Sequence, residues 1–295
     1  MTKKETLSHF LLLSVAFIYG ANYVWAKFIM PSPVSPNSFI LIRALGATTL
    51  FWIFFKKHWV LPDRKDWPAI LLCGACGIAI NQLFFFNGLA LTAPLHAAII
   101  MVLTPIIVTL FAVLILKQKT TKFQWIGISI GMIGAMGFIG YGQLNPMEGA
   151  SFQGDLYILI NAVSYSVYLI AVKPLMKKYH PLSLIPWFFT FGLLLILPFG
   201  WKEMQNLPFA SITPFQWLII GFVVLFVTFF TYLFNIIAIQ HLSPTHAGIY
   251  IYLQPPIAAM FAALAGMPIQ SLFNLPKIIF VFLIVFGIYA VSKKQ

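Results

Sequence analysis

The chain alternates between long apolar stretches and short connectors that hold most of its charged residues. A helix of about 20 apolar residues crosses a hydrocarbon layer of about 30 Å. Backbone N–H and C=O groups in that layer must be paired within the segment, so each stretch is predicted to be a helix. The pattern predicts an all-α polytopic membrane protein with ten transmembrane helices, roughly at 8–29, 37–55, 68–89, 95–116, 124–142, 155–175, 184–200, 216–238, 245–265 and 277–292.

Basic residues are distributed unevenly between the two sets of connectors. If the N-terminus is cytoplasmic, the inner segments hold 13 Lys and Arg residues, whereas the outer connectors hold only Lys202 and Lys277. Cytoplasmic segments of membrane proteins carry such an excess of positive charge. The distribution therefore predicts that both termini are cytoplasmic. It also accounts for the net charge of +12 without any nucleic-acid partner.

The two halves of the chain resemble each other. Residues 94–105 and 244–255 are identical at six of twelve positions, and the offset between matching segments stays nearly constant over four helices. A repeat of five helices is odd, so the second copy must enter from the opposite face. Inverted repeats are typical of alternating-access transporters, with the substrate site near the middle of the membrane. The predicted repeats are residues 1–147 and 148–295.

Composition supports the membrane prediction and limits the chemistry. Only 8% of the residues are charged, against roughly 25% in soluble domains, and the mean hydropathy is +0.93. Cys73 and Cys76 lie within an apolar stretch and lack a second ligand pair, so buried thiols are expected there. The basic start, Lys3 and Lys4, precedes an apolar run too long for a signal peptide, which is therefore interpreted as the first span.

Several motifs resemble the EamA branch of the drug/metabolite transporter superfamily. They are YGANYVWAK (19–27), LIRALGA (41–47), RKDWPAILLCG (64–74), FNGLALTAP (86–94), the Leu–x–Pro of 103–105 and 253–255, and GDLYILINAVSYSVYLI (154–170). The resemblance implies a ten-helix exporter or exchanger of amino acids or other small metabolites in a bacterial cytoplasmic membrane, without a cofactor. Members often carry Gly-Glu after the fourth and ninth helices, where this chain has 117–119 KQK and 266–268 GMP.

Polar side chains recur at helical spacing within the predicted spans. They are costly in lipid and are expected to face the interior of the bundle. One interpretation is that they line a central cavity, and the other is that they hold helices together by hydrogen bonds or packing. The candidates for substrate binding are Tyr19, Asn22, Asn81, Gln82, His96, Thr104, Asn161, Tyr165, Tyr168, Tyr232, Asn235, His246, Tyr250 and Gln254.

Proline and glycine mark two further features. Pro105 and Pro255 interrupt the fourth and ninth helices at matching points and are predicted to bend them as hinges. The fifth helix carries Gly127, Gly131, Gly134 and Gly137, whose small size allows close approach of another helix. The tenth helix is its expected partner.

Charged residues inside the spans narrow the choice of solute. Lys27, Arg43 and Lys173 either reach the interface or form an electrostatic funnel for a carboxylate or phosphate. All six acidic residues are placed at span ends or in connectors, so the site should suit neutral, zwitterionic or anionic solutes. If protons are coupled, His96 and His246 are the candidates, because an unperturbed imidazole titrates near pH ~6.5. Because no carboxylate lies deep in a span, a facilitator or exchanger whose net flux follows the solute gradient is expected.

The leading hypothesis is an exporter or facilitator of small metabolites, with amino acids first. The alternatives in the same fold are an organic-phosphate or nucleotide-sugar antiporter and a lipid-linked sugar flippase. An intramembrane enzyme would need a motif such as H-E-x-x-H or G-x-S-x-G, or paired carboxylates, and the chain shows none. No metal site is expected, and the expected partners are a small-molecule solute and the bilayer. The sequence does not determine the oligomeric state, and a monomer is compatible with it.

Overall fold

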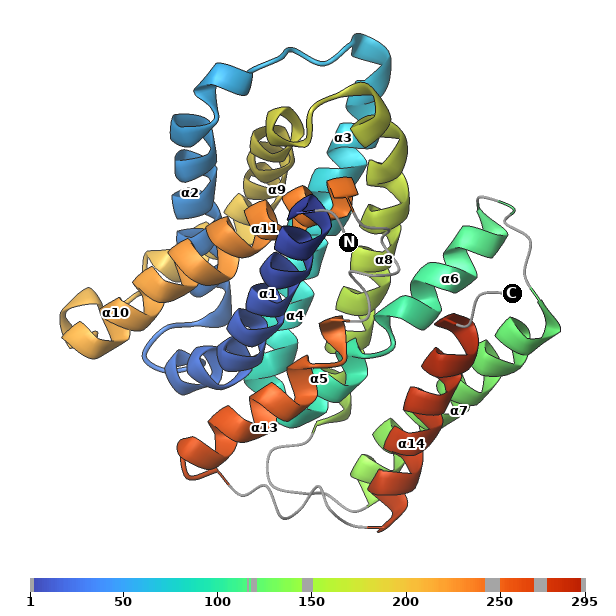
Figure 1. Ribbon diagram of the computed structural model, residues 1–295. Helices are drawn as coiled ribbons and strands as arrows, with labels where there is room; N and C mark the ends of the chain where they lie inside the picture. Colours follow the sequence, from blue (N-terminus) through green and yellow to red (C-terminus); the bar gives the residue numbers. More distant parts are fainter. Residues whose placement is uncertain are drawn as a thin grey trace.

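The computed structural model describes residues 3–115, 117, 121–144, 151–241, 250–267 and 275–292 of the 295-residue chain. The described residues form helices, turns and connectors, and none of them belongs to a strand (Figure 1). The helices are α1 (Lys3–Ile29), α2 (Pro36–Phe54), α3 (Trp67–Gly74), α4 (Ile80–Leu91), α5 (Pro94–Met101), α6 (Thr104–Leu114), α7 (Lys122–Leu144), α8 (Phe152–Lys178), α9 (Pro181–Met204), α10 (Pro214–Phe222), α11 (Thr231–His241), α13 (Gln254–Leu264) and α14 (Leu275–Ser292), with short 3-10 turns at Lys56–His58, Arg64–Asp66 and Phe209–Ser211.

Eight helical segments of the described residues are long and apolar enough to cross a membrane. Two shorter apolar helices, Gln254–Leu264 and Leu275–Gly287, overlap the ninth and tenth predicted spans. Large apolar side chains are exposed on the outside, including Leu218 (67%) and Leu264 (77%), as expected for a surface in contact with lipid. The predicted all-α polytopic membrane protein is confirmed, whereas the count of ten spans stays a prediction.

Several helices begin at a proline. A proline in the first turn costs no hydrogen bond, because the first N–H groups of a helix have no partner within it. At the start of α10, Thr213 also forms a capping box with Gln216. These local signals explain why the predicted boundaries lie within a few residues of the helices, as at Pro36, Pro94, Pro181 and Pro214.

The fourth predicted span is two helices rather than one bent helix. Residues 102–103 form a turn between α5 and α6, and Pro105 is the second residue of α6. Proline lacks the N–H that would bond the carbonyl of Met101, and the hydroxyl of Thr104 donates to that carbonyl instead, at 2.7 Å. In the other half, α13 likewise begins one residue before Pro255.

Two π-helical segments interrupt the third and eighth predicted spans, which the hydropathy pattern did not predict. They are Ala75–Ala79, between α3 and α4, and Val223–Phe230, between α10 and α11. In the second segment the hydroxyl of Thr228 donates to the carbonyl of Val223, five residues earlier, at 2.9 Å. The segments lie in corresponding helices of the two predicted repeats. Single π turns inside helices are frequent at functional sites.

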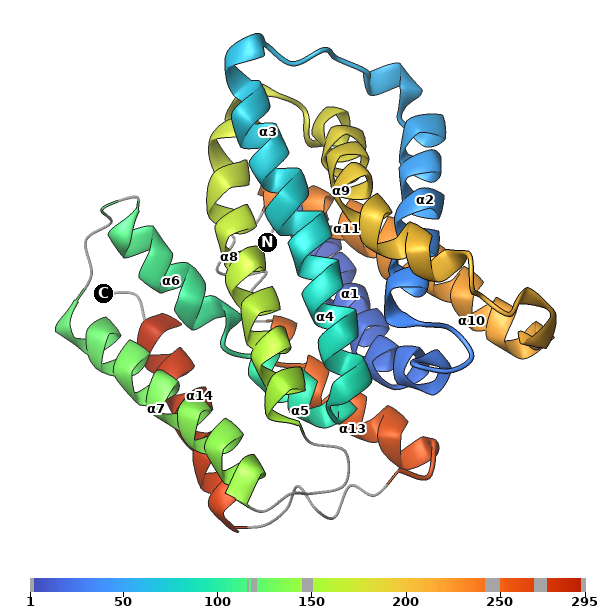
Figure 2. The same ribbon diagram turned by 180° about the vertical axis from the view of Figure 1, so that it is seen from behind.

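Helices from the two halves of the chain pack against one another. α1 contacts α11 and α13, α2 contacts α9, and α4 contacts α8. α7 and α14 form a pair on the side of the molecule away from α2 and α10 (Figures 1 and 2). A Cβ atom on Gly134 of α7 would lie 2.9 Å from the backbone nitrogen of Ile284 in α14. The predicted glycine packing of the fifth helix against the tenth is confirmed.

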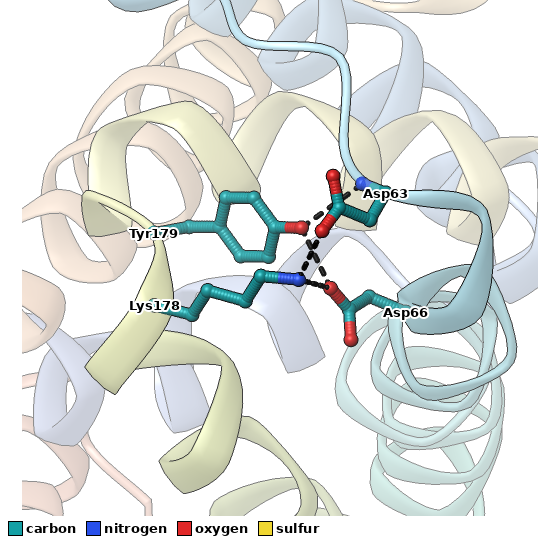
Figure 3. Close-up of polar contacts among 4 residues, drawn as sticks. All are labelled: Asp63, Asp66, Lys178 and Tyr179. Carbon is teal, nitrogen blue, oxygen red and sulfur yellow. Dashed lines mark hydrogen bonds and ion pairs between the residues drawn. The ribbon is translucent and has the colours of Figure 1, made fainter.

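A polar cluster joins the connection between α2 and α3 to the end of α8 (Figure 3). The ammonium of Lys178 bonds both Asp63 and Asp66, and the hydroxyl of Tyr179 donates to Asp66 at 2.6 Å. The backbone N–H of Asp63 donates to the same hydroxyl at 2.9 Å. Exposed ion pairs contribute little to stability, because water screens the two charges. The cluster therefore fixes the position of this connection more than it stabilises the fold.

Candidate functional site

A cavity of about 360 Å³ lies between helices of the two halves of the chain. The structure brings eleven of the fourteen candidate substrate-binding residues to its wall. Their role in binding stays a prediction, because no ligand contact tests it. They are Tyr19, Asn22, Asn81, Gln82, Thr104, Asn161, Tyr165, Tyr232, Asn235, Tyr250 and Gln254.

The other three candidates do not line this cavity. Tyr168 borders an adjoining small pocket of about 20 Å³ together with Tyr165 and Tyr232. His96 is buried elsewhere, beside Asp155. His246 lies outside the described residues. The helical spacing that selected these residues gives the direction of a side chain only to within part of a turn, so it could not separate neighbouring faces.

Hydrogen bonds across the cavity wall join the first half of the chain to the second. The amide of Asn161 donates to the carbonyl of Asn81 at 2.7 Å, and the hydroxyl of Tyr232 donates to the carbonyl of Gly77 at 3.0 Å. Gly77 belongs to the first π-helical segment. The two bonds therefore tie backbone carbonyls of the first half to side chains of the second half at the cavity wall.

The sequence analysis did not select Tyr23, although it lines the cavity. Its hydroxyl donates to the side-chain oxygen of Gln254 at 3.1 Å, which links α1 to α13. Tyr23 follows Tyr19 by four residues, a spacing that puts both on one helix face. The signal was present in the sequence, because the same spacing was used for the candidates in α8 and α11.

Arg43 lies inside the protein, 3% exposed, rather than reaching the membrane interface. Its Nε and Nη2 atoms donate to the hydroxyl of Thr228 at 3.0 and 2.9 Å. Its guanidinium carbon lies 4.1 Å from the ring centre of Phe86, close enough for a cation–π contact. The π-helical segment positions Thr228, whose own hydroxyl proton goes to Val223. The guanidinium is therefore held in one orientation at the cavity wall.

Among the described residues, five buried polar atoms of the cavity lining have no hydrogen-bond partner in the protein. The donors are Nη1 of Arg43 and the amide nitrogen of Gln82, and the acceptors are the side-chain oxygens of Asn22, Gln82 and Asn161. Buried polar groups in folded proteins are nearly always paired. Atoms of this kind at the wall of a cavity are suited to bind a solute that carries both an acceptor and a donor.

The three basic residues of the predicted funnel have different surroundings. Arg43 and Lys173 line the cavity, and the described residues of its wall include no Asp or Glu. Lys27 is absent from that wall. Its ammonium donates to the carbonyls of Leu89 and Ala90, at 3.0 and 2.7 Å, and so caps the end of α4.

Asp155 lies in the first turn of α8, at a span end as expected, but it is also fully buried, which the sequence analysis did not predict. Lys277, assigned to an outer connector, lies in the first turn of α14 and is 1% exposed. Both findings have one cause. Neighbouring helices and the turn at Thr92 cover these helix starts, and hydropathy along the chain does not record such tertiary cover.

The helix breaks before Pro105 and Pro255 lead to a prediction about rate. Replacing Pro105 by alanine restores the N–H that a continuous helix needs, so the break should partly close and transport should slow several-fold. Pro255→Ala should have a smaller effect, because Pro256 follows it and still lacks an N–H. Initial rates in proteoliposomes, normalised to reconstituted protein, measure this effect. Wild-type rates in both single variants and in the double variant would contradict a hinge role.

The sequence of the chain is similar to those of known membrane transporters, in agreement with its apolar helices and internal cavity. The model of the EamA-like transporter family matches residues 6–140 and 152–293. The uncharacterized transporter YyaM of Bacillus subtilis is 24% identical over 96% of this chain and 93% of its own length. A probable terminal-alkyne amino-acid exporter of Streptantibioticus cattleyicolor is 26% identical over 68% of this chain and 66% of its own.

Two further similar proteins bear on the membrane location and on the fold. An uncharacterized inner membrane transporter of Salmonella typhimurium, YicL, is 25% identical over 68% of each chain. A solved crystal structure superposes with a TM-score of 0.63, covering 95% of this chain and 94% of that one at 17% identity. At this identity the superposition shows a shared fold.

Proposed function

We propose that this chain, which belongs to the EamA-like transporter family, transports small zwitterionic metabolites, amino acids above all. It is an integral membrane protein of that transporter family, and the proposal concerns its solute and its mode of action. The solute would bind in the central cavity and reach each side of the membrane in turn. We infer a bacterial cytoplasmic membrane as its location, with both termini inside.

The unpaired polar atoms at the cavity wall support a zwitterion. The free N–H of Arg43 suits a carboxylate, because a guanidinium binds such a group with charge-assisted hydrogen bonds. The side-chain oxygens of Asn22 and Asn161 suit the protons of an ammonium group. With Lys173 also at the wall, and no acidic lining residue among those described, the solute itself must bring the negative charge.

Cavity size and one relative support the same class of solute. A volume of about 360 Å³ lies at the small end of the range for ligand sites, about 300–1,000 Å³. The similar protein from Streptantibioticus cattleyicolor is named as a probable exporter of an amino acid. Export or exchange of an amino acid is accordingly the first activity to measure.

Counterflow in proteoliposomes tests the proposal. Vesicles loaded with an unlabelled amino acid should accumulate the same labelled amino acid transiently, without any ion gradient, because exchange requires only alternating access. The panel should include neutral, acidic and basic amino acids, phosphate esters and a nucleotide sugar. We expect exchange of zwitterionic amino acids and none of permanent cations.

Two controls make the result decisive. Protein-free vesicles report leakage, and each amino acid is paired with its methyl ester, which lacks the carboxylate. Exchange of phosphate esters in preference to amino acids would replace the proposal by an organic-phosphate antiporter that uses Arg43 and Lys173. Equal exchange of an amino acid and its ester would contradict recognition of the carboxylate.

A further inference from the structure

Four buried polar side chains meet where α4 ends and α5, α8 and α14 begin. Asp155 accepts a hydrogen bond from the hydroxyl of Thr92 at 2.5 Å, and its second oxygen lies 3.4 Å from Nδ1 of His96. On the other side of the ring, Nε2 of His96 lies 3.4 Å from Nζ of Lys277. None of the four is more than 2% exposed. We call these four residues the outer array, since the predicted topology puts them toward the outside.

The outer array joins the two halves of the chain beyond one end of the cavity. Thr92 and His96 belong to the first half, and Asp155 and Lys277 belong to the second. None of them lines the cavity, whose wall instead extends to Gln124, near the start of α7 at the opposite end. Figure 2 shows the end of α4 and the starts of α5 and α8 together in the lower part of the view. The array thus lies beyond the end of the cavity that is opposite Gln124.

The chemistry of the three ionisable groups fixes the direction of each contact. An ionised carboxylate only accepts hydrogen bonds, so Nδ1 of His96 carries the proton that faces Asp155. Nε2 then has a lone pair, which accepts from the ammonium of Lys277. A second proton, on Nε2, would turn that acceptor into a donor and set an imidazolium against an ammonium 3.4 Å away. The contact between α5 and α14 would be lost, while the one to Asp155 would strengthen.

The electrostatic surroundings of the His96 ring are set mainly by Asp155 and Lys277. Among the described residues, the charged groups recorded against its ring are Asp155 and Lys277. Phe138 of α7 covers the ring, with a centroid separation of 4.8 Å. A charge that appears on the imidazole is therefore felt mainly by the anion on one side and the cation on the other.

Other titratable groups on the packed elements have partners of their own. Lys27 of α1 donates to carbonyls at the end of α4. Tyr157 of α8 packs edge-on against Phe84, and Tyr141 of α7 packs against Phe280. None of these contacts involves the imidazole of His96.

We propose that the outer array binds a proton from the outer solution, and that this proton releases α14 from α5 and so couples transport to the pH difference. The proton forms an N–H bond at Nε2 of the imidazole while the array is open to the outer solution. It leaves to the inner solution, by way of the cavity, when the array closes, and no other bond forms or breaks. The inference rests on the proposed function for the solute and adds the coupled ion. It replaces the expectation of uncoupled flux, which assumed that no buried carboxylate was present.

A thiol reporter tests the array without any solute. Met101 lies in α5 and lines the cavity, so a Met101→Cys thiol, in a Cys73→Ala/Cys76→Ala background, becomes reachable from outside only when this end opens. Right-side-out vesicles are treated with a membrane-impermeant maleimide at two outer pH values, about two units apart. Since thiol reactivity itself changes with pH, each rate is divided by that of the same reporter with His96→Gln.

His96→Gln keeps a donor and an acceptor in place but cannot titrate. The labelling rate with His96 present, divided by the rate with His96→Gln, should be at least about fivefold higher at the lower pH. This factor corresponds to an opening that is favoured by about 1 kcal/mol. Lys277→Gln is the second variant, because removing the ammonium removes the repulsion and should also abolish the response. His180→Gln, an exposed histidine beyond the end of α8, is the matched control and should leave the response intact. The proposal is overturned if the wild-type ratio of labelling rates does not change with pH. It is also overturned if His180→Gln loses the pH response to the same extent as His96→Gln.

Proteoliposomes separate this inference from the proposed function. When the outer solution is the more acidic one, protons move inward and should drive solute outward in the wild-type protein but not in His96→Gln. Solute counterflow without a pH gradient should persist in both. Counterflow without any effect of the gradient overturns proton coupling and leaves the proposed function standing. Absent counterflow contradicts the proposed solute, and the maleimide result then decides on the array by itself.

Discussion

Amino-acid exchange should fall about ten- to a hundredfold when Arg43 is replaced by methionine. The variant keeps an unbranched side chain in place but removes the donor at the cavity wall, together with the bonds to Thr228 and the cation–π contact with Phe86. Hydrogen bonds to charged groups contribute about 1.5–3 kcal/mol, which corresponds to this range. Counterflow rates at a fixed amount of folded protein, together with the dissociation constant of the solute, measure the effect.

The design includes a ligand control and a residue control. The methyl ester of the same amino acid lacks the carboxylate, so Arg43→Met should not weaken its binding further. Lys27→Met removes a cation that bonds the end of α4 outside the cavity, and it should leave solute affinity unchanged. Equal losses for the amino acid and its ester would show that Arg43 acts on the fold rather than on the carboxylate.

Arg43→Lys adds a geometric test. A lysine keeps the charge, but it lacks the planar fork that donates to Thr228 and to a solute at the same time. Affinity should therefore recover only in part. Full recovery would indicate that charge alone suffices at this position.

The second large effect is expected on stability. Gly134→Ala places a methyl group 2.9 Å from the backbone nitrogen of Ile284 and equally close to the carbonyl of Phe280. These are backbone atoms and cannot turn aside, so α7 and α14 must separate. Overpacking of this kind costs about 1–3 kcal/mol. The apparent melting temperature of the purified protein in detergent should fall by several degrees.

Gly140→Ala is the matched control, because it lies in the same helix and a Cβ there would meet nothing within 4 Å. Alanine also favours a helix over glycine by about 1 kcal/mol, so this variant should melt at the same temperature or higher. A similar decrease for both variants would mean that α7 does not depend on close contact with α14.

The sequence determined the architecture because its signals are local or periodic. Helix formation in lipid follows from an apolar stretch, and the helix starts follow from prolines such as Pro94 and Pro214. Helical spacing within α1, α8 and α11 also identified six polar or tyrosine side chains at the cavity wall. Glycine spacing predicted the contact between α7 and α14 for the same reason, since the pattern and the helix have nearly the same period.

Only the tertiary structure decided which polar groups are paired and which are free. Lys27 and Arg43 are both basic residues within apolar stretches of the sequence. In the structure, Lys27 donates to the end of α4, whereas Arg43 donates to Thr228 at the cavity wall. The two π-helical segments depend on packing and on side-chain bonds to the backbone, which have no period in the sequence. Asp155 and Lys277 are buried by helices distant in the chain, and hydropathy along the sequence carries no record of that cover.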